Sequence, residues 1–164
     1  MKLKNEVSYS TIIHKLFELK ETHFDDKLNV MNQQCLYLYE NGYNNGYLAH
    51  WAADNAYSAQ YDHDNYWILE MHGRSRHIAK VSLQYFFEKE LNKMNDMKHL
   101  LISVGKGHQS RDNTPVLQDC LIPYLQQKIG IEKIDVNTRP NFLYIDRNDL
   151  ILYLNNSKNK VSHQ

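Results

Sequence analysis

Two short loops of this sequence bring together residue types that carry out acid-base and phosphate chemistry. They are Leu69-Glu70-Met71-His72-Gly73 and Val104-Gly105-Lys106-Gly107-His108, and each follows an apolar run that predicts a strand and precedes a helical pattern. If the two strands are parallel neighbours, both loops leave the sheet at the carboxyl ends, where open α/β sheets bind their ligands. Carboxylate, imidazole and ammonium groups at one edge suit an anionic ligand, most simply a phosphodiester.

Each polar residue of these loops has a chemical interpretation and a plainer one. An imidazole trades a proton near neutral pH, so His72 could act as general base or acid, or it could merely bond a carbonyl at a strand end. Glu70 could orient His72, contact a ribose, bind a cation or lie in solvent as an ordinary carboxylate. Lys106 lies between two glycines, which lets the backbone approach a phosphate while the side chain neutralises charge; a simple turn lysine is the alternative.

The spacing of the histidines and cysteines predicts neither a metal site nor a cofactor. The histidines outside the two loops are scattered, and Glu70 with His72 is the one pair that could begin a ligand set. Cys35 and Cys120 are far apart and form no Cys-x-x-Cys, which argues against a zinc site or a disulfide framework and favours a reducing compartment.

The first part of the chain reads as helical. Apolar residues near helical spacing predict a helix from Ser10 to about Val30, a second run spans about 29–40, and a third spans about 47–61. The cluster Asn41-Gly42-Tyr43-Asn44-Asn45-Gly46 predicts a turn, so residues 29–64 read as an antiparallel helical hairpin. Its aromatic residues could contact a protein partner or pack the hairpin onto the sheet, and packing is the favoured interpretation; they are Tyr39, Tyr43, Tyr47 and Trp51.

The pattern from residue 66 onwards alternates strands and helices. Strands are predicted at 66–69, 100–104, 132–137 and 142–145, and helices at 75–92 and from about 114 to Gly130. Ser75 caps the first of these helices, Pro123 should bend the second, and Asn141 suits a left-handed turn before the last strand. The order β-α-β-α-β-β predicts an α/β two-layer sandwich with a mixed sheet, begun by a right-handed parallel crossover.

Three regions follow from these patterns: a helical extension over 1–64, an α/β domain over 65–154 and a polar, disordered tail over 155–164. The net charge is zero, but residues 1–66 hold 5 Lys and Arg against 9 Asp and Glu, whereas 67–164 hold 14 against 10. Because this basic bias is modest, any nucleic-acid contact should be local and involve few phosphates. Without a secretory signal or an 18-residue apolar run, the chain is expected to be soluble and cytoplasmic, with no membrane contact.

The paired loops resemble the motifs of the small MutS-related domain, Smr. The family pattern is Leu-Asp-x-His-Gly followed by Gly-Lys/Arg-Gly-x-His-Ser, and the similarity covers about residues 66–147. Residues 29–64, including Gly46-Tyr47-Leu48-Ala49, are similar to the small helical hairpin that often precedes Smr domains in eukaryotic proteins. The resemblance implies a nucleic-acid endonuclease, acting on structured or branched DNA in bacterial members and on mRNA at stalled ribosomes in several eukaryotic ones. The eukaryotic-type hairpin favours RNA.

Carried over by position, the resemblance makes Glu70 the acid, His72 the imidazole, Lys106 the cation and Ser110 the trailing hydroxyl. The chain departs from the family at Glu70, where Asp is usual, and at Gln109, where His is usual. The neighbouring His108 is our own substitute for that imidazole. The expected catalytic residues are Glu70, His72, Lys106 and His108, and the expected nucleic-acid contacts are Gly73, Arg74, Arg76, Gly105, Gly107, Gln109, Ser110, Arg111 and Asn113.

The expected function is metal-independent cleavage of single-stranded RNA, such as mRNA on stalled ribosomes, by attack of the ribose 2′-hydroxyl on the phosphodiester. Two alternatives stay open. One is a non-catalytic module that binds RNA or the ribosome, favoured by Glu70 and Gln109. The other is a structure-specific nuclease that nicks DNA.

Overall fold

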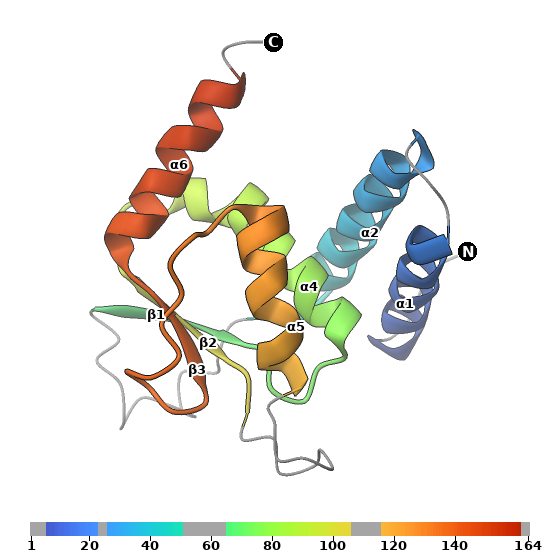
Figure 1. The fold of residues 1–164 in the computed structure, drawn as a ribbon. Helices are drawn as coiled ribbons and strands as arrows, with labels where there is room; N and C mark the ends of the chain where they lie inside the picture. Colours follow the sequence, from blue (N-terminus) through green and yellow to red (C-terminus); the bar gives the residue numbers. More distant parts are fainter. Residues whose placement is uncertain (1–5, 23–25, 51–64, 106–115, 162–164) are drawn as a thin grey trace. The chain divides into compact units, whose positions relative to one another are not determined.

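A computed structural model describes residues 6–22, 26–50, 65–105 and 116–161 (Figure 1). Its contacts divide the chain into two compact units. Unit 1 comprises Met1–Ala49 and Arg74–Leu91, and unit 2 comprises His50–Gly73 and Asn92–Gln164. The segment 74–91 therefore groups with the amino-terminal helices, and the two units interleave along the sequence.

Unit 1 is built from helices that share one apolar core. They are α1 (Glu6–Thr22), α2 (Asp26–Asn44) and α4 (Arg76–Tyr85), and each contacts the other two. The predicted helix from Ser10 to Val30 is therefore wrong, because α1 ends at Thr22 and α2 begins at Asp26. A straight helix rises 1.5 Å per residue and would carry its apolar side chains apart, whereas a break lets both helices face one core. That core contains Tyr9, Ile13, Phe17, Cys35, Leu36, Tyr39, Leu48, Ile78, Val81 and Tyr85.

The turn after α2 lies at the end of the predicted cluster 41–46, because α2 continues to Asn44, beyond its predicted end near residue 40. Gly42 is still helical and packs tightly, since a Cβ there would lie 2.7 Å from Leu48 Cδ1. The chain reverses at Gly46, whose φ is +74°. Residues 47–50 are not helical, so the predicted start of the third helix at Tyr47 is wrong; the rest of that prediction, 51–64, lies outside the described residues.

The helix predicted over 75–92 is confirmed, with a change of bonding pattern. Ser75 caps α4, and its Oγ accepts a hydrogen bond from the Ile78 N–H at 3.3 Å. The helix continues as the π-helix η1 (Phe86–Glu90) and the short 3₁₀ turn η2 (Leu91–Lys93). In α4 the buried residues are Ile78, Ala79, Val81, Ser82, Leu83 and Tyr85, whereas Arg76, Lys80 and Gln84 remain at least partly exposed, as in an amphipathic helix.

The sheet of unit 2 has three strands in the order β1-β2-β3 (Figure 1). The strand β1 (Tyr66–Glu70) pairs in parallel with β2 (His99–Ser103), which confirms the predicted parallel pair. The strand β3 (Phe142–Ile145) pairs antiparallel with β2, and its preceding turn places Asn141 at φ +70° as expected. The fold is thus α/β with a mixed sheet.

The strand predicted over 132–137 is wrong. This segment contributes a single bridge, between Asp135 and Tyr144. The carboxylate of Asp135 explains the early end, because Oδ1 accepts hydrogen bonds from the N–H groups of Asn137 and Thr138 at 2.7 and 3.1 Å. Such a local turn competes with the ladder and bends the chain away from β3.

Both faces of the sheet are buried, as the nearly continuous apolar runs predict. One face carries Ile68, Leu101 and Phe142, each at most 5% exposed, with Tyr66 and Tyr144 packed beside them. The other face carries residues that are fully buried: Leu69, Leu100, Ile102, Leu143 and Ile145. The sheet is therefore a fixed frame for the loops at its ends.

Helix α5 (Val116–Tyr124) changes into the π-helix η3 (Leu125–Ile129), which Gly130 ends at φ +96°. Pro123 lies inside α5, and α-helical bonding gives way two residues later, in keeping with its missing N–H donor. The predicted caps of this helix, Thr114 and Pro115, lie outside the described residues.

The prediction of a disordered tail from residue 155 is wrong for residues 155–161, which belong to α6 (Arg147–Val161). Asp146 starts this helix: Oδ1 accepts a hydrogen bond from the Asn148 N–H at 2.8 Å. Leu150 is fully buried, and Lys158 and Lys160 lie in the last turn, where positive charge favours the helix dipole. Across the described ranges, every helix is too short or too polar to cross a membrane.

Candidate functional site

The carboxyl ends of β1 and β2 lie side by side and hold the first predicted motif. Glu70 is the register partner of Ser103, so the last residues of the two strands are neighbours. The ladder continues one residue further, because the Met71 N–H donates to the Ser103 carbonyl at 3.1 Å. Met71 is fully buried, which anchors the loop between two polar residues, Glu70 and His72.

The imidazole of His72 lies directly against Gly105. A Cβ built on Gly105 would be 2.4 Å from Cδ2 of the ring and 3.2 Å from Nε2. Since His72 belongs to the first loop and Gly105 to the second, the structure brings the described start of the second loop against the first. His72 is exposed, so its ring is open to a ligand.

The carboxylate of Glu70 acts on the main chain of its own loop. Its Oε1 accepts a hydrogen bond from the backbone N–H of His72 at 2.8 Å. Gly73, at φ +78°, then turns the chain away from the strand. Of the roles considered for Glu70, this contact favours orientation of His72, and it does so through the backbone of that residue.

Sequence reasoning missed a further neighbour of Glu70. The carbonyl of His50 accepts a hydrogen bond from the Glu70 N–H, so the segment before residue 51 pairs with the end of β1. His50 is fully buried. A buried histidine leaves no distinct pattern in the sequence, because the apolar surroundings that bury it come from distant parts of the chain.

The expected cations are distributed unevenly. Arg74 and Arg76 belong to unit 1, where Arg74 is half-buried and Arg76 is exposed at the first residue of α4. Arg74 acts on the buried Tyr39: burial raises the pKa of Tyr39, and a hydrogen bond with Ser82 and the charge of Arg74 oppose that rise. Arg74 therefore has a place within the helical unit, and its expected contact with nucleic acid stays a prediction.

Most of the second motif lies outside the described residues. These are Lys106, Gly107, His108, Gln109, Ser110, Arg111 and Asn113, and their predicted roles stay predictions. Within the described ranges, no three His, Cys, Asp or Glu side chains group closely enough to hold a metal ion.

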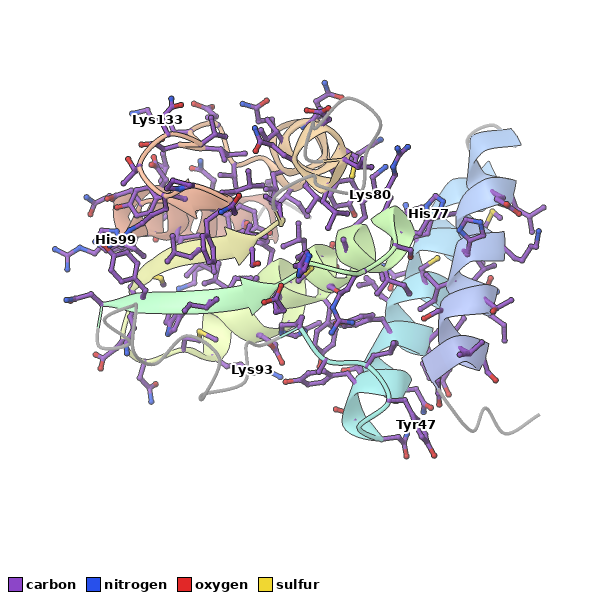
Figure 2. All side chains as sticks on the ribbon, turned by 90° about the horizontal axis from the view of Figure 1, so that it is seen from below. Tyr47, His77, Lys80, Lys93, His99 and Lys133 are labelled. Carbon is purple, nitrogen blue, oxygen red and sulfur yellow. The ribbon has the colours of Figure 1, made fainter. Side chains whose placement is uncertain are left out.

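A second polar cluster, which sequence reasoning missed, occupies the opposite end of the sheet (Figure 2, label His99). His99 Nδ1 lies 2.9 Å from the Tyr144 hydroxyl and 3.2 Å from Asp146 Oδ2, and the Arg147 N–H points at the same nitrogen from 3.2 Å. Tyr66 packs on His99 with a ring separation of 5.6 Å, and the Arg139 guanidinium lies 5.4 Å from the centre of the Tyr66 ring.

The ionisation of this cluster follows from its contacts. Burial, followed by the hydrogen bond and charge of Asp146, raises the pKa of Tyr144 to about 12. The hydrogen bond from the Asn148 N–H lowers the pKa of Asp146, and the Tyr144 hydroxyl and the nearby His99 and Arg147 add to that effect. Beside it, Tyr144 and Asp146 line an open pocket of about 330 Å³ together with Lys133, Asp135 and Asp149. The side chains of His99, Tyr144 and Asp146 thus contact one another.

Comparisons with protein-family models, with curated proteins and with solved structures each found no match. The function must therefore be argued from the residues of the chain. The two clusters differ in what they offer a ligand. At the amino end of the sheet the polar groups bond to one another, whereas at the carboxyl end the imidazole of His72 is exposed.

Proposed function

We propose that this protein is an endoribonuclease that cleaves single-stranded RNA by attack of a ribose 2′-hydroxyl on the adjacent phosphodiester. One observation supports the proposal most directly. The exposed imidazole of His72 lies against Gly105, at the point where two parallel strands end. A proton-transfer group at this edge of an α/β sheet is in the place where such sheets bind anionic ligands.

The reaction needs two proton transfers and no other reactant. The 2′-hydroxyl loses its proton to a base as its oxygen bonds to phosphorus, and the leaving 5′-oxygen takes a proton from an acid. The products are a 2′,3′-cyclic phosphate and a free 5′-hydroxyl. His72 takes one of these proton-transfer roles, and His108 is the expected partner for the other. Lys106 offsets the negative charge that develops on the phosphate oxygens.

Glu70 and Gly105 serve the reaction by holding His72. The Glu70 carboxylate fixes the backbone N–H of His72 at 2.8 Å, and Gly105 leaves room for its ring. Reaction rates depend steeply on such placement, since a displacement of about 1 Å can cost about 100-fold. An exposed catalytic side chain gains from supports of this kind because burial does not restrict its rotamers.

A second candidate function has one observation in its favour. The Glu70 carboxylate accepts a hydrogen bond from the main chain of His72. This contact directs the carboxylate neither at the imidazole nor at a substrate. Together with Gln109 in place of the usual histidine, this arrangement would suit a module that binds RNA or the ribosome without cutting it.

The test is a cleavage assay with single-stranded RNA in excess EDTA, followed by analysis of the product ends. We expect 2′,3′-cyclic phosphate ends, and no cleavage where a single 2′-deoxy residue precedes the scissile phosphate. His72→Ala should abolish cleavage, whereas His14→Ala, which removes an exposed imidazole from α1, should not. Cleavage that EDTA abolishes and that proceeds equally on DNA would reject the proposal. RNA binding without cleavage, unchanged in His72→Ala, would select the binding module.

A further inference from the structure

The contact between His72 and Gly105 sets a steric condition that the sequence does not reveal. The three ring atoms nearest to a Cβ built on Gly105 are Cδ2 at 2.4 Å, Nε2 at 3.2 Å and Cγ at 3.3 Å. Real Cβ atoms essentially never come within 3.0 Å of another heavy atom. Any side chain at position 105 must therefore displace the imidazole.

The same contact fixes the direction of the ring. Its Cδ2 atom is turned towards Gly105, with Nε2 and Cγ at nearly equal distances on either side, and Nδ1 is not among the three nearest ring atoms. The main chain of His72 is held separately by Glu70 Oε1. The residue is thus supported twice, at its backbone N–H and at its ring, although it is exposed to solvent.

Gly105 differs in this respect from other glycines of the chain. Its φ of +77° is matched by Gly46 at +74° and approached by Gly130 at +96°. All three have backbone conformations that residues with a Cβ rarely adopt. At Gly46 and Gly130, however, no atom among the described residues lies within 4 Å of the Cβ position. A residue with a Cβ would strain the backbone at all three positions, whereas the clash with an imidazole arises at Gly105.

We propose that Gly105 is a positioning residue that forms the seat for the His72 imidazole and holds the ring at the edge of the sheet where the proposed function puts the scissile phosphodiester. This role differs from the close approach of backbone to phosphate that the glycine-rich loop suggests. The inference rests on the proposed function for its catalytic consequence, but the seat itself can be measured without a substrate.

The experiment compares Gly105→Ala with Gly46→Ala and Gly130→Ala, which introduce the same methyl group at positive φ without a ring to displace. In the unchanged protein and in both controls, NMR should show contacts between the His72 ring protons and the α-protons of Gly105. In Gly105→Ala the ring signals should shift and those contacts should disappear. The kcat for RNA cleavage should fall about 100-fold in Gly105→Ala, as expected for a misplaced catalytic group, and should stay unchanged in the controls.

A second comparison keeps the inference testable if Gly105→Ala folds poorly. In His72→Ala the glycine is kept and the ring is gone, so the α-proton signals of Gly105 should lose the shift that the nearby imidazole ring imposes on them. His14→Ala, which removes a different exposed imidazole, should leave those signals in place. Equal Gly105 signals in the unchanged protein and in His72→Ala would overturn the seat.

The outcomes separate this inference from the function on which it rests. If the unchanged protein cuts RNA and Gly105→Ala cuts it equally well with the ring signals in place, the seat is rejected and the nuclease stands. If the NMR contacts are present but no RNA is cut, the proposed function is rejected, and with it the catalytic part of this inference.

Discussion

The two ends of the sheet in unit 2 both hold a histidine and a carboxylate, and they use the pair in opposite ways. At the amino end, Asp146 and Tyr144 contact the ring nitrogen of His99 directly. At the carboxyl end, Glu70 contacts the backbone of His72, and the ring rests on Gly105. A carboxylate directed at the ring ties the imidazole into the fold, whereas a carboxylate directed at the main chain leaves it available.

This difference shows why residue types alone do not identify a site. His99 is 25% exposed and its Nδ1 already faces a hydroxyl, a carboxylate and a backbone N–H. A substrate would have to displace those contacts to reach Nδ1. His72 is exposed, so a substrate can approach it from the solvent. We therefore propose that the first histidine serves stability and the second serves the reaction.

Comparing the variants His72→Ala and His99→Ala gives the sharpest test of this assignment. His72→Ala should lower kcat by about 10²–10⁴, the usual contribution of a general acid or base, with little change in melting temperature. His99→Ala should leave kcat unchanged and lower the free energy of unfolding by about 1–2 kcal/mol, because it removes hydrogen bonds that include a charged partner. Cleavage kinetics and denaturant unfolding measure the two effects. Loss of stability in His72→Ala, with activity lost in His99→Ala, would reverse the comparison.

The next effect concerns the direction of the Glu70 carboxylate. If its task is to accept the His72 N–H, Glu70→Gln retains an accepting oxygen and most of the activity. Glu70→Ala loses the contact, and kcat should fall about tenfold, in line with one hydrogen bond of about 1.4 kcal/mol. Cleavage rates of the three proteins over pH 5 to 9 decide the point. An activity lost equally in both variants would make the Glu70 charge itself part of the reaction.

The smallest effect is a pH dependence at the amino end. The folded protein lowers the pKa of Asp146 below its ordinary value of 3.8, so the ionised carboxylate stabilises the fold above that value. This contribution is lost as the pH falls from about 3.8 through the lowered pKa. Asp146→Asn keeps an oxygen to start α6 but has no charge, so its unfolding should depend less on pH in this range. Urea unfolding at pH 7, 4 and 3 compares the two proteins.

Much of the frame around the site could be predicted from the sequence, because it depends on local signals. The apolar runs predicted the parallel pair β1 and β2, and Ser75 predicted the start of α4. The strand expected over 132–137 was wrong because one carboxylate, Asp135, captures two backbone N–H groups and ends the pairing. The helical tail was missed because its polar composition concealed a cap at Asp146 and an anchor at Leu150.

The candidate site, too, could be predicted only in part. Glu70, His72 and Gly105 could be selected by residue type and spacing, and the structure brings them together. The direction of the Glu70 carboxylate and the ring contact at Gly105 depend on backbone angles that no spacing encodes. His50 and His99 were missed because their surroundings are assembled from segments distant in sequence.

The interleaving of the two units affects how the chain can be cut and how it folds. The chain passes from β1 through 74–91 before it reaches β2, and this segment shares a core with α1 and α2. Removing residues 1–49 would thus uncover the apolar side chains of Ile78, Val81 and Tyr85 in the connection between two paired strands. During synthesis β1 emerges before β2, so the two strands can pair only after residues 74–91 have been synthesised.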